Sequence, residues 1–358
     1  MTLPSASAEK VLRILVVDDS AFMRRAIERI LAAQPGMAVA GVAADGIEAV
    51  QRALELRPDV ITMDVEMPRL DGVGAVREIM QAVPTPIVML STKTTTGAET
   101  TLRALDAGAV NFVAKPGPLS ADLASLGDAL RAAILAASEA RVRRRPASLG
   151  VVPEESPERR APSHDMPASH LIVIGASSGG PPALAELVSR LPAGLGAAVL
   201  IVQHLPAGFT AALAHRLDTI SALPVTEAVD GEALHVGGIF VAPGGVHTVV
   251  GRDRRLHFNE APPVHGVRPS IDVALDSATQ VFGRNACVAI LTGMGRDGAE
   301  GAARLQAAGG KVFTQDEASS LIYGMPRAAH ERTPSAMQAG PAQLGDWLAQ
   351  VFPQIGVR

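Results

Sequence analysis

The sequence predicts an α/β protein of two domains, each a doubly wound parallel β-sheet with helices on both faces. Short apolar runs alternate with amphipathic segments along 12–136 and again from residue 171 onward. Between these stretches the composition changes to proline and mixed charge. The chain has 358 residues, 47% of them hydrophobic, which is enough for two full cores. Alternating strand and helix patterns are typical of parallel sheets that are covered on both faces.

Five strand-helix units are expected in the N-terminal stretch. The expected strands are 12–17, 37–43, 60–63, 87–90 and 109–113, and helical patterns include 21–33, 47–56 and 121–137. Ligands of such sheets bind at the carboxyl ends of the strands. The residues that follow each strand are therefore the first candidates for a site.

The middle of the chain is predicted to be a linker. An arginine run at 141–145 gives way to a segment rich in proline and charge, without apolar periodicity. We interpret the arginines as solvated linker charge rather than a partner site. The predicted boundaries are 1–138 for the first domain, 139–168 for the linker and 169–358 for the second domain.

The second domain repeats the strand-helix pattern. The expected strands are 171–175, 197–203, 225–229, 238–242, 286–292 and 311–315. The expected helices are 181–191, 208–220, 270–282, 298–308 and 340–351. A turn-like segment inside 246–259 predicts a β-hairpin.

Composition restricts the class of protein. The net charge of -4 favours neither nucleic acid nor an anionic membrane, and few aromatic residues are present to stack bases. The single cysteine, Cys287, is expected to be a buried thiol. No signal peptide or apolar stretch of about 20 residues is apparent. We expect a cytoplasmic monomer that neither inserts into membranes nor binds nucleic acid.

Acidic residues gather at the strand ends of the first domain. Asp18 and Asp19 end the first expected strand, and Asp64 follows the third. These strand ends share one edge of the sheet, where three carboxylates repel each other unless a hard cation such as Mg²⁺ neutralises them. The pattern predicts a magnesium site.

Two further residues complete this pocket. Ser91 ends the fourth strand and could bind a phosphoryl oxygen, while Lys115 follows the fifth and supplies a positive charge. Alone, a strand-end aspartate is usually a turn or cap residue, and a lone lysine is usually at the surface. The five together predict a phosphoryl-accepting site with Asp64 as the nucleophile.

With the segment 65–72 after Asp64, these residues resemble the receiver domain of two-component response regulators, over residues 11–136. The resemblance implies a flavodoxin-like fold. It also implies that the backbone carbonyl of Glu66 helps to bind Mg²⁺ and that Phe112 occupies the aromatic switch position.

The second domain carries a candidate hydrolytic site. Ser177 follows strand 171–175 and precedes a glycine-rich helix start, near backbone N–H groups. His204 ends the next strand and could be its base, and Asp297, after strand 286–292, could orient that base. N–H groups of the 293–295 loop could hold an oxyanion.

Simpler readings exist for each residue. Ser177 could be a helix N-cap, and His204 could be a histidine at a strand end whose ring nitrogens simply have hydrogen-bond partners. Asp297 could be the N-cap of helix 298–308, which is expected in addition to its orienting role.

Two other patterns compete. The segment 175–179 fits the G-x-S-x-G elbow of α/β-hydrolases, but that fold needs the acid before the histidine, and only His330 could supply that order. The segment 293–298 fits G-x-G-x-x-G with Asp316 after the next strand, a dinucleotide fingerprint. Against it, Asp297 would place a carboxylate beside the pyrophosphate.

Several segments of the whole chain resemble the CheB family of chemotaxis protein-glutamate methylesterases. They are 174–180, 202–206 with 208–210, 240–245, 268–272, 291–299 and 323–326. The resemblance implies Ser177 as nucleophile, His204 as general base and acid, and Asp297 as its orienter. It further implies the Met294 N–H as an oxyanion donor and Ser178, commonly threonine in the family, as a supporting residue.

The resemblance also implies a reaction and partners. The enzyme would hydrolyse glutamyl methyl esters on methyl-accepting chemoreceptors, release methanol, and also deamidate receptor glutamines. Ester hydrolysis would need no metal, and Mg²⁺ would serve the receiver. A CheA-type histidine kinase would phosphorylate Asp64 and relieve inhibition by a receiver that covers the catalytic edge.

Two other classes stay open on the sequence. One is a signalling adaptor whose hydrolytic site is idle, which turnover would exclude. The other is a nicotinamide-dependent oxidoreductase that uses the 293–298 loop, which tight saturable binding of NADH would support.

Overall fold

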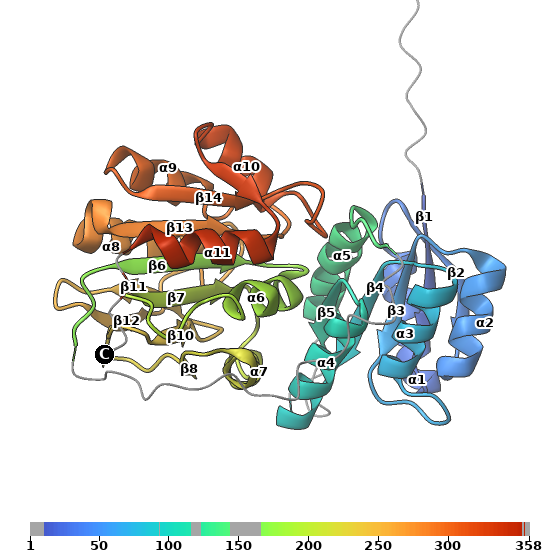
Figure 1. Ribbon diagram of the computed structural model, residues 1–358. Coiled ribbons are helices and arrows are strands. Elements are labelled where there is room, and N and C mark those ends of the chain that lie inside the picture. Colours follow the sequence, from blue (N-terminus) through green and yellow to red (C-terminus); the bar gives the residue numbers. More distant parts are fainter. Residues whose placement is uncertain (1–10, 93, 116–122, 144–165, 353, 355–358) are drawn as a thin grey trace, which may run out of the picture. The chain divides into compact units, whose positions relative to one another are not determined.

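The computed structural model describes residues 11–92, 94–115, 123–143, 166–352 and 354, and it divides into two compact units (Figure 1). The expectation that the start of the chain contains no signal peptide concerns residues 1–10, which lie outside the described residues. Residues 144–165 of the predicted linker lie outside them as well. The domain boundaries at 138 and 169 stay predictions.

The N-terminal unit contains a five-stranded parallel sheet in the order β2-β1-β3-β4-β5. Its strands are β1 (Leu12–Val17), β2 (Met37–Ala43), β3 (Val60–Asp64), β4 (Ile87–Ser91) and β5 (Asn111–Ala114). The helices of this stretch are α1 (Ala21–Ala32), α2 (Gly46–Leu56), α3 (Gly72–Ala82), α4 (Thr95–Ala107) and α5 (Leu123–Ser138). Helix α1 packs against α5, and α2 against α3. The strand order reverses between β1 and β3, which makes their carboxyl ends the switch point where ligands bind.

The C-terminal unit contains a seven-stranded parallel sheet in the order β15-β14-β13-β6-β7-β10-β8. Its strands are β6 (Leu171–Ala176), β7 (Ala198–Gln203), β8 (Val225–Glu227), β10 (Ile239–Val241), β13 (Ala286–Ile290), β14 (Lys311–Gln315) and β15 (Met337–Ala339). A smaller antiparallel sheet holds β9 (Glu232–Ala233), β11 (His247–Val250) and β12 (Arg255–Asn259). The first strand, β6, lies between β7 and β13, so the switch point is at its carboxyl end.

Two groups of helices accompany this larger sheet. Helix α6 (Gly180–Val188) packs against α7 (Phe209–Ile220) and α11 (Pro341–Val351). Helix α9 (Ala299–Ala307) packs against α8 (Ile271–Phe282) and α10 (Met325–Arg332), and a 3-10 turn at Gly283–Asn285 follows α8.

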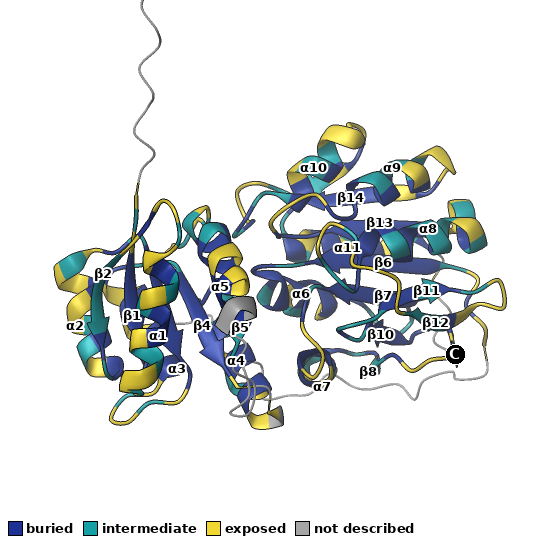
Figure 2. Cartoon of the chain, turned by 180° about the vertical axis from the view of Figure 1, so that it is seen from behind, coloured by how far each residue is buried: buried dark blue, intermediate teal, exposed yellow. Residues whose placement is uncertain are grey.

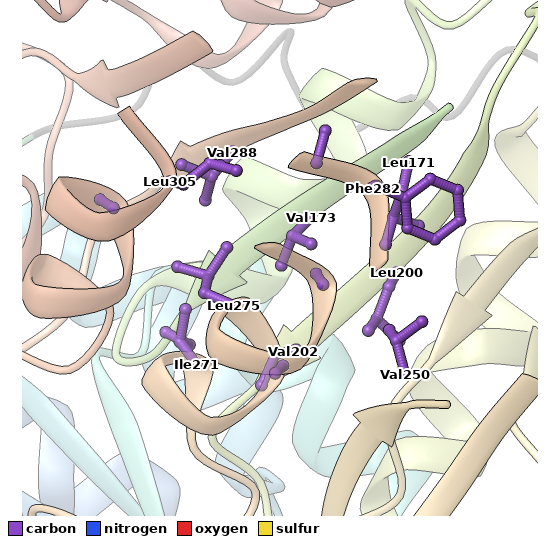
Figure 3. Close-up of a cluster of buried hydrophobic side chains, with 14 of the residues drawn as sticks. Leu171, Val173, Leu200, Val202, Val250, Ile271, Leu275, Phe282, Val288 and Leu305 are labelled. Atoms are coloured by element: carbon purple, nitrogen blue, oxygen red, sulfur yellow. The ribbon is translucent and has the colours of Figure 1, made fainter. Parts of the chain in front are cut away.

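The core of the C-terminal unit lies between β6, β7, β13 and the helices α8 and α9 (Figure 3). Val173 and Val288 are fully buried there, as are Leu275 of α8 and Leu305 of α9. Each such side chain contributes roughly 1.5–3 kcal/mol by leaving water. This packing fixes where the N-terminal end of α8 lies relative to the sheet edge.

The structure confirms the predicted fold class of two parallel-sheet α/β units. Figure 2 shows the buried strands flanked by helices with exposed outer faces. The hairpin expected in 246–259 forms from β11 and β12.

Three elements were not expected from the sequence: β9, β15 and α10. The two strands have only two and three residues, too few for a periodic signal. Helix α10 has a polar sequence, and its first N–H, from Met325, is tied to the Gly293 carbonyl at 2.8 Å. In the part of the chain that is described, no helix is long and apolar enough to span a bilayer.

Candidate active sites

The structure brings the three N-terminal carboxylates together at the switch point of the first sheet. Asp18 follows β1 and Asp64 is the last residue of β3; both are buried, whereas Asp19 is exposed. Each offers a carboxylate oxygen, and these oxygens all lie within 4.8 Å of one another. The strand-end rule alone places them, since consecutive parallel strands end at the same edge.

Lys115 is the cation that the structure pairs with these acids. Its Nζ lies 2.8 Å from Asp18 Oδ2 and 2.7 Å from Asp64 Oδ2. Burial raises the pKa of Asp64 to about 6, although Lys115 acts to lower it and Asp18 to raise it. Burial lowers the pKa of Lys115, but the bonds to both carboxylates outweigh this and the net shift is upward. One lysine therefore compensates this pocket only in part.

The remaining predicted residues of the pocket lie nearby with less defined roles. Ser91 is the fully buried last residue of β4, and its carbonyl accepts from the Lys115 N–H at 2.7 Å. Phe112 on β5 is buried with 8% exposure. The Glu66 side chain is exposed, which is compatible with a role for its backbone only.

Sequence reasoning missed Arg24, which supports the acidic loop from the first turns of α1. Its Nη1 donates to the carbonyls of Asp18 at 2.6 Å and Asp19 at 3.1 Å. The available signal was its spacing, four residues after the N-cap Ser20.

The donor set fits a hard divalent cation. The pocket holds two buried carboxylates and one exposed one, with a single bridging ammonium. Oxygen ligands of this kind suit Mg²⁺, whose charge would complete the compensation that Lys115 begins.

The C-terminal candidate site begins at paired strand ends. Ala176 of β6 pairs with Gln203 of β7, so Ser177 and His204 each follow their strand at the same level. The His204 N–H donates to the Ala176 carbonyl at 3.0 Å. Ser177 is half-buried, and its N–H donates to the Thr292 carbonyl at 3.0 Å.

His204 pairs with Asp297 through the far nitrogen of its ring. The Nε2 of His204 lies 2.8 Å from Asp297 Oδ2. This leaves Nδ1 as the nitrogen that can take a proton from a hydroxyl, the reverse of the common serine-protease arrangement. Among the described residues, neither His204 Nδ1 nor Ser177 Oγ has a hydrogen-bond partner.

Asp297 is anchored at the N-terminal end of α8. Its Oδ1 accepts from Ser270 Oγ at 2.8 Å and the Asp272 N–H at 3.0 Å, and its Oδ2 accepts from the Ile271 N–H at 2.7 Å. Burial raises the pKa of Asp297, but His204 and the helix N–H groups outweigh it, and the net shift is downward. The carboxylate is thus held ionised and in one orientation.

The prediction that Asp297 also caps its own helix is wrong. The N-cap of α9 is Gly298, with no side-chain bond. Asp297 instead accepts from the first two N–H groups of α8, whose N-cap is Ser270, because core packing brings the start of α8 close to β13.

A second carboxylate, Asp272, makes the reciprocal contact. It lies in the first turn of α8, and its Oδ1 accepts from the Gly301 N–H of α9 at 2.7 Å. Its Oδ2 pairs with His265 Nε2 at 3.0 Å. Burial, reinforced by the charge of Asp297, raises the pKa of Asp272. Sequence reasoning passed over Asp272 and His265 because neither follows a strand of the main sheet.

The 293–298 loop lies against the nucleophile. A β-carbon on Gly293 would lie 2.7 Å from Ser177 Cβ, so only glycine allows this approach. Met294 is 40% exposed, and within the described residues its N–H has no acceptor. Ser178 is buried, and its carbonyl accepts from Thr292 Oγ1 at 3.0 Å.

The competing patterns find little support in this geometry. The start of α9, where a dinucleotide phosphate would bind, already receives the Asp272 carboxylate. His330 lies within α10, whereas His204 holds the pair with the acid.

Comparison with known proteins finds a family match for each of the two units. The family model described as CheB methylesterase matches residues 172–348, and that described as response regulator receiver domain matches 14–125. The protein-glutamate methylesterase/protein-glutamine glutaminase of Symbiobacterium thermophilum is 45% identical over 337 residues, which cover 91% of this chain and 93% of that protein. The Pyrococcus abyssi protein of the same name is 42% identical over 327 residues, 89% of this chain and 88% of its own length.

One solved structure extends this similarity to three dimensions. The catalytic domain of Thermotoga maritima CheB methylesterase matches with a TM-score of 0.50 and 33% identity, over 51% of this chain and 98% of that one.

Proposed function

The chain belongs to the CheB methylesterase family and carries a response regulator receiver domain before its catalytic part, and we propose that phosphorylation activates it to hydrolyse glutamyl methyl esters on methyl-accepting chemoreceptors. Methanol is the product that leaves. The proposed domain boundaries are 1–138, 139–168 and 169–358.

The observation that carries this proposal is the His204–Asp297 pair beside Ser177. The 2.8 Å bond fixes Nε2 as the protonated ring nitrogen facing the acid. The half-buried hydroxyl of Ser177 follows the neighbouring strand at the same level. This is the constellation that acyl transfer requires: a nucleophile, a base and an oriented acid.

In the first half of the reaction, Ser177 Oγ attacks the ester carbonyl while His204 Nδ1 takes the hydroxyl proton. The carbonyl oxygen becomes an oxyanion, which the Met294 N–H stabilises. Asp297 keeps the imidazolium oriented. The C–OCH₃ bond then breaks, His204 gives its proton to the leaving oxygen, and methanol departs from a Ser177 acyl-enzyme.

In the second half, water attacks the acyl-enzyme and loses its proton to His204. Collapse of this second oxyanion intermediate returns the proton to Ser177 Oγ and frees the glutamate carboxyl group. A receptor glutamine would follow the same steps with ammonia as the leaving group, which is the proposed deamidation. Ser178 supports the nucleophile turn through its carbonyl bond to Thr292.

In the receiver, Asp64 accepts the phosphoryl group from a CheA-type histidine kinase. Asp18, Asp19, Asp64 and the Glu66 carbonyl would hold Mg²⁺, which would offset the negative charge of the carboxylates and phosphoryl oxygens. Lys115 contacts both buried carboxylates and can pair with the added phosphoryl group. Ser91 lies at the same edge to bind a phosphoryl oxygen, and Phe112 is the proposed aromatic switch.

We place this reaction in the cytoplasm, in a monomeric enzyme that binds receptors and kinase but neither nucleic acid nor the bilayer. The ester chemistry is assigned entirely to side chains and backbone groups of the C-terminal unit.

The test is methanol release from methylated chemoreceptor membranes by intact protein and by Ser177→Ala, each with and without acetyl phosphate and Mg²⁺. We expect release that needs Ser177 and rises with the phosphoryl donor. No release from folded protein, on membranes that a known methylesterase demethylates, would refute the proposed activity. Release that acetyl phosphate leaves unchanged would refute the activation.

A further inference from the structure

One buried amide joins the main chains of the two residues that carry the proposed reaction. Gln203, the last residue of β7, is 1% exposed. Its Nε2 donates to the Ser177 carbonyl at 2.9 Å and to the His204 carbonyl at 3.3 Å. An amide nitrogen has two hydrogens, so both are used, one for the nucleophile and one for the base.

The other end of the same amide is left without a partner. Oε1 of Gln203 is a buried acceptor that no described residue satisfies. It lies against Gly180, the first residue of α6, where a β-carbon would overlap it. The partial positive charge of the helix start favours an oxygen here, but an unpaired buried acceptor is still unfavourable.

Burial alone would favour an apolar residue at position 203. The remaining residues of β7 are all apolar and buried. A buried polar residue that keeps an unsatisfied atom breaks this pattern, and such exceptions concentrate at functional sites. The two donated bonds are what the exception provides.

The backbone of Ser177 is also held from the opposite side. Its N–H donates to the Thr292 carbonyl, and the Thr292 N–H donates to Gln315 Oε1 at 2.8 Å. The Ser177 carbonyl accepts from the Gly180 N–H at 2.8 Å as well as from Gln203. Of these contacts, only Gln203 also reaches His204.

We propose that Gln203 is a positioning residue that fixes the separation of the Ser177 hydroxyl and the His204 ring. This rests on the proposed function. The amide holds the two residues at their carbonyls, while their side chains share no hydrogen bond in the described structure. Without the amide, the ladder of β6 and β7 still holds the strands up to the bond between the His204 N–H and the Ala176 carbonyl, but the carbonyls of Ser177 and His204 lose their common donor.

The test compares wild-type protein with Gln203→Met, which keeps the length of the side chain and removes both donors. We expect kcat for methanol release to fall about 10- to 100-fold with KM changed less than about threefold, because misplaced groups slow the chemical step. Labelling of Ser177 by a fluorophosphonate should slow in parallel. Thr314→Val is the matched control: this buried hydroxyl of β14 has no partner among the described residues, and its loss should leave both rates unchanged.

A merely structural role predicts a different outcome. In that case Gln203→Met lowers the thermal midpoint, while kcat and the labelling rate of the folded enzyme stay within twofold of wild type, and the proposal is overturned. If Gln203→Met does not fold, Gln203→Asn replaces it. The shorter amide can keep one of the two hydrogen bonds, so the proposal requires kcat to fall, but by less than the loss expected for Gln203→Met.

Two measurements separate this proposal from the proposed function. Labelling of Ser177 reports the reactivity of the nucleophile whether or not receptors are the substrate. If wild type releases no methanol from receptors but Gln203→Met is still labelled more slowly than wild type, only the proposed substrate is refuted. In wild-type protein, both side-chain amide protons of Gln203 should exchange slowly with solvent in nuclear magnetic resonance spectra. Fast exchange of either proton would overturn the proposal without any variant.

Discussion

Asp64 and Asp297 lie at the carboxyl edges of two different sheets but have opposite surroundings. Asp64 is the last residue of β3, and Asp297 lies in the loop that leads from β13 to α9. Burial dominates at Asp64 and raises its pKa to about 6, since Lys115 is shared with Asp18. At Asp297, His204 and the N–H groups of α8 outweigh the effect of burial, and the pKa of the carboxyl group is lowered. Placement at the carboxyl edge of a sheet thus does not set the role of a carboxylate; the number of donors that it receives does.

The difference has a structural origin. Asp297 receives two N–H groups of α8, the Ser270 hydroxyl and His204, so its lone pairs are occupied and it can only orient. Asp64 keeps capacity for a cation and for a phosphoryl group. A saturated carboxylate suits an orienting residue, and an unsaturated one suits a nucleophile.

The largest expected effect is on Asp297. Asp297→Asn should lower kcat for methanol release about 10³- to 10⁴-fold, because a neutral amide cannot hold the imidazolium or its tautomer. Steady-state kinetics at a temperature where the variant is folded measures this. A fall of less than tenfold would mean that the carboxylate does not act through His204.

The next effect is on stability and comes from Asp64. A raised pKa means that ionisation opposes folding, so this penalty appears as the pH rises from about 4 to about 6 and is fully present at pH 7. Asp64→Asn should therefore raise the free energy of unfolding by about 2 kcal/mol at pH 7 without divalent cations, and by nearly nothing at pH 4.

Urea titrations at the two pH values measure this difference, and Mg²⁺ should stabilise wild type more than Asp64→Asn. Asp71→Asn is the control, because Asp71 is an exposed N-cap of α3 and asparagine caps equally well. Destabilisation by Asp64→Asn at pH 7 would contradict the account of this pocket.

A smaller effect is expected at Asp272, which touches neither His204 nor Ser177. Asp272→Asn keeps an oxygen for the Gly301 N–H, so kcat should stay within about tenfold of wild type. Because the pKa of Asp272 is raised, its ionisation also opposes folding, and the variant should gain stability relative to wild type as the pH rises above the usual range of aspartate. A loss of activity as large as that of Asp297→Asn would show that the two carboxylates act as one unit.

These carboxylates show how far the sequence could lead. Asp18, Asp19, Asp64 and Lys115 were predicted together because the strand-end rule needs only local patterns. The pairing of His204 with Asp297 was reached in the same way, from strand order.

What the sequence could not predict depends on packing between distant segments. The anchoring of Asp297 on α8, instead of its own helix, follows from how α8 docks on the sheet. The two hydrogen bonds that the Gln203 amide donates depend on the register of β6 and β7. Helix α10 has a polar sequence and is held by the 293–298 loop, so no periodicity marks it.

The smallest expected effect is at Cys287, the one cysteine in the sequence. Its thiol is buried in β13, and burial raises its pKa. It should react with an aromatic disulfide reagent only when the C-terminal unit unfolds, and Cys287→Ala should leave kcat nearly unchanged. Reaction at the same rate in native and in unfolded protein would contradict this burial. The thiol then reports unfolding of the C-terminal unit alone, which separates the effects of Asp64 and Asp297 variants.

The most direct test of the central comparison is a pH titration of the aspartate carboxyl carbons by ¹³C nuclear magnetic resonance, without divalent cations. Asp64→Asn and Asp297→Asn assign the two signals. We expect Asp64 to titrate near pH 6, while Asp297 stays ionised below the usual range of aspartate. If Asp297 took up its proton at a higher pH than Asp64, the assignment of an orienting acid and a phosphoryl acceptor from their surroundings would be contradicted.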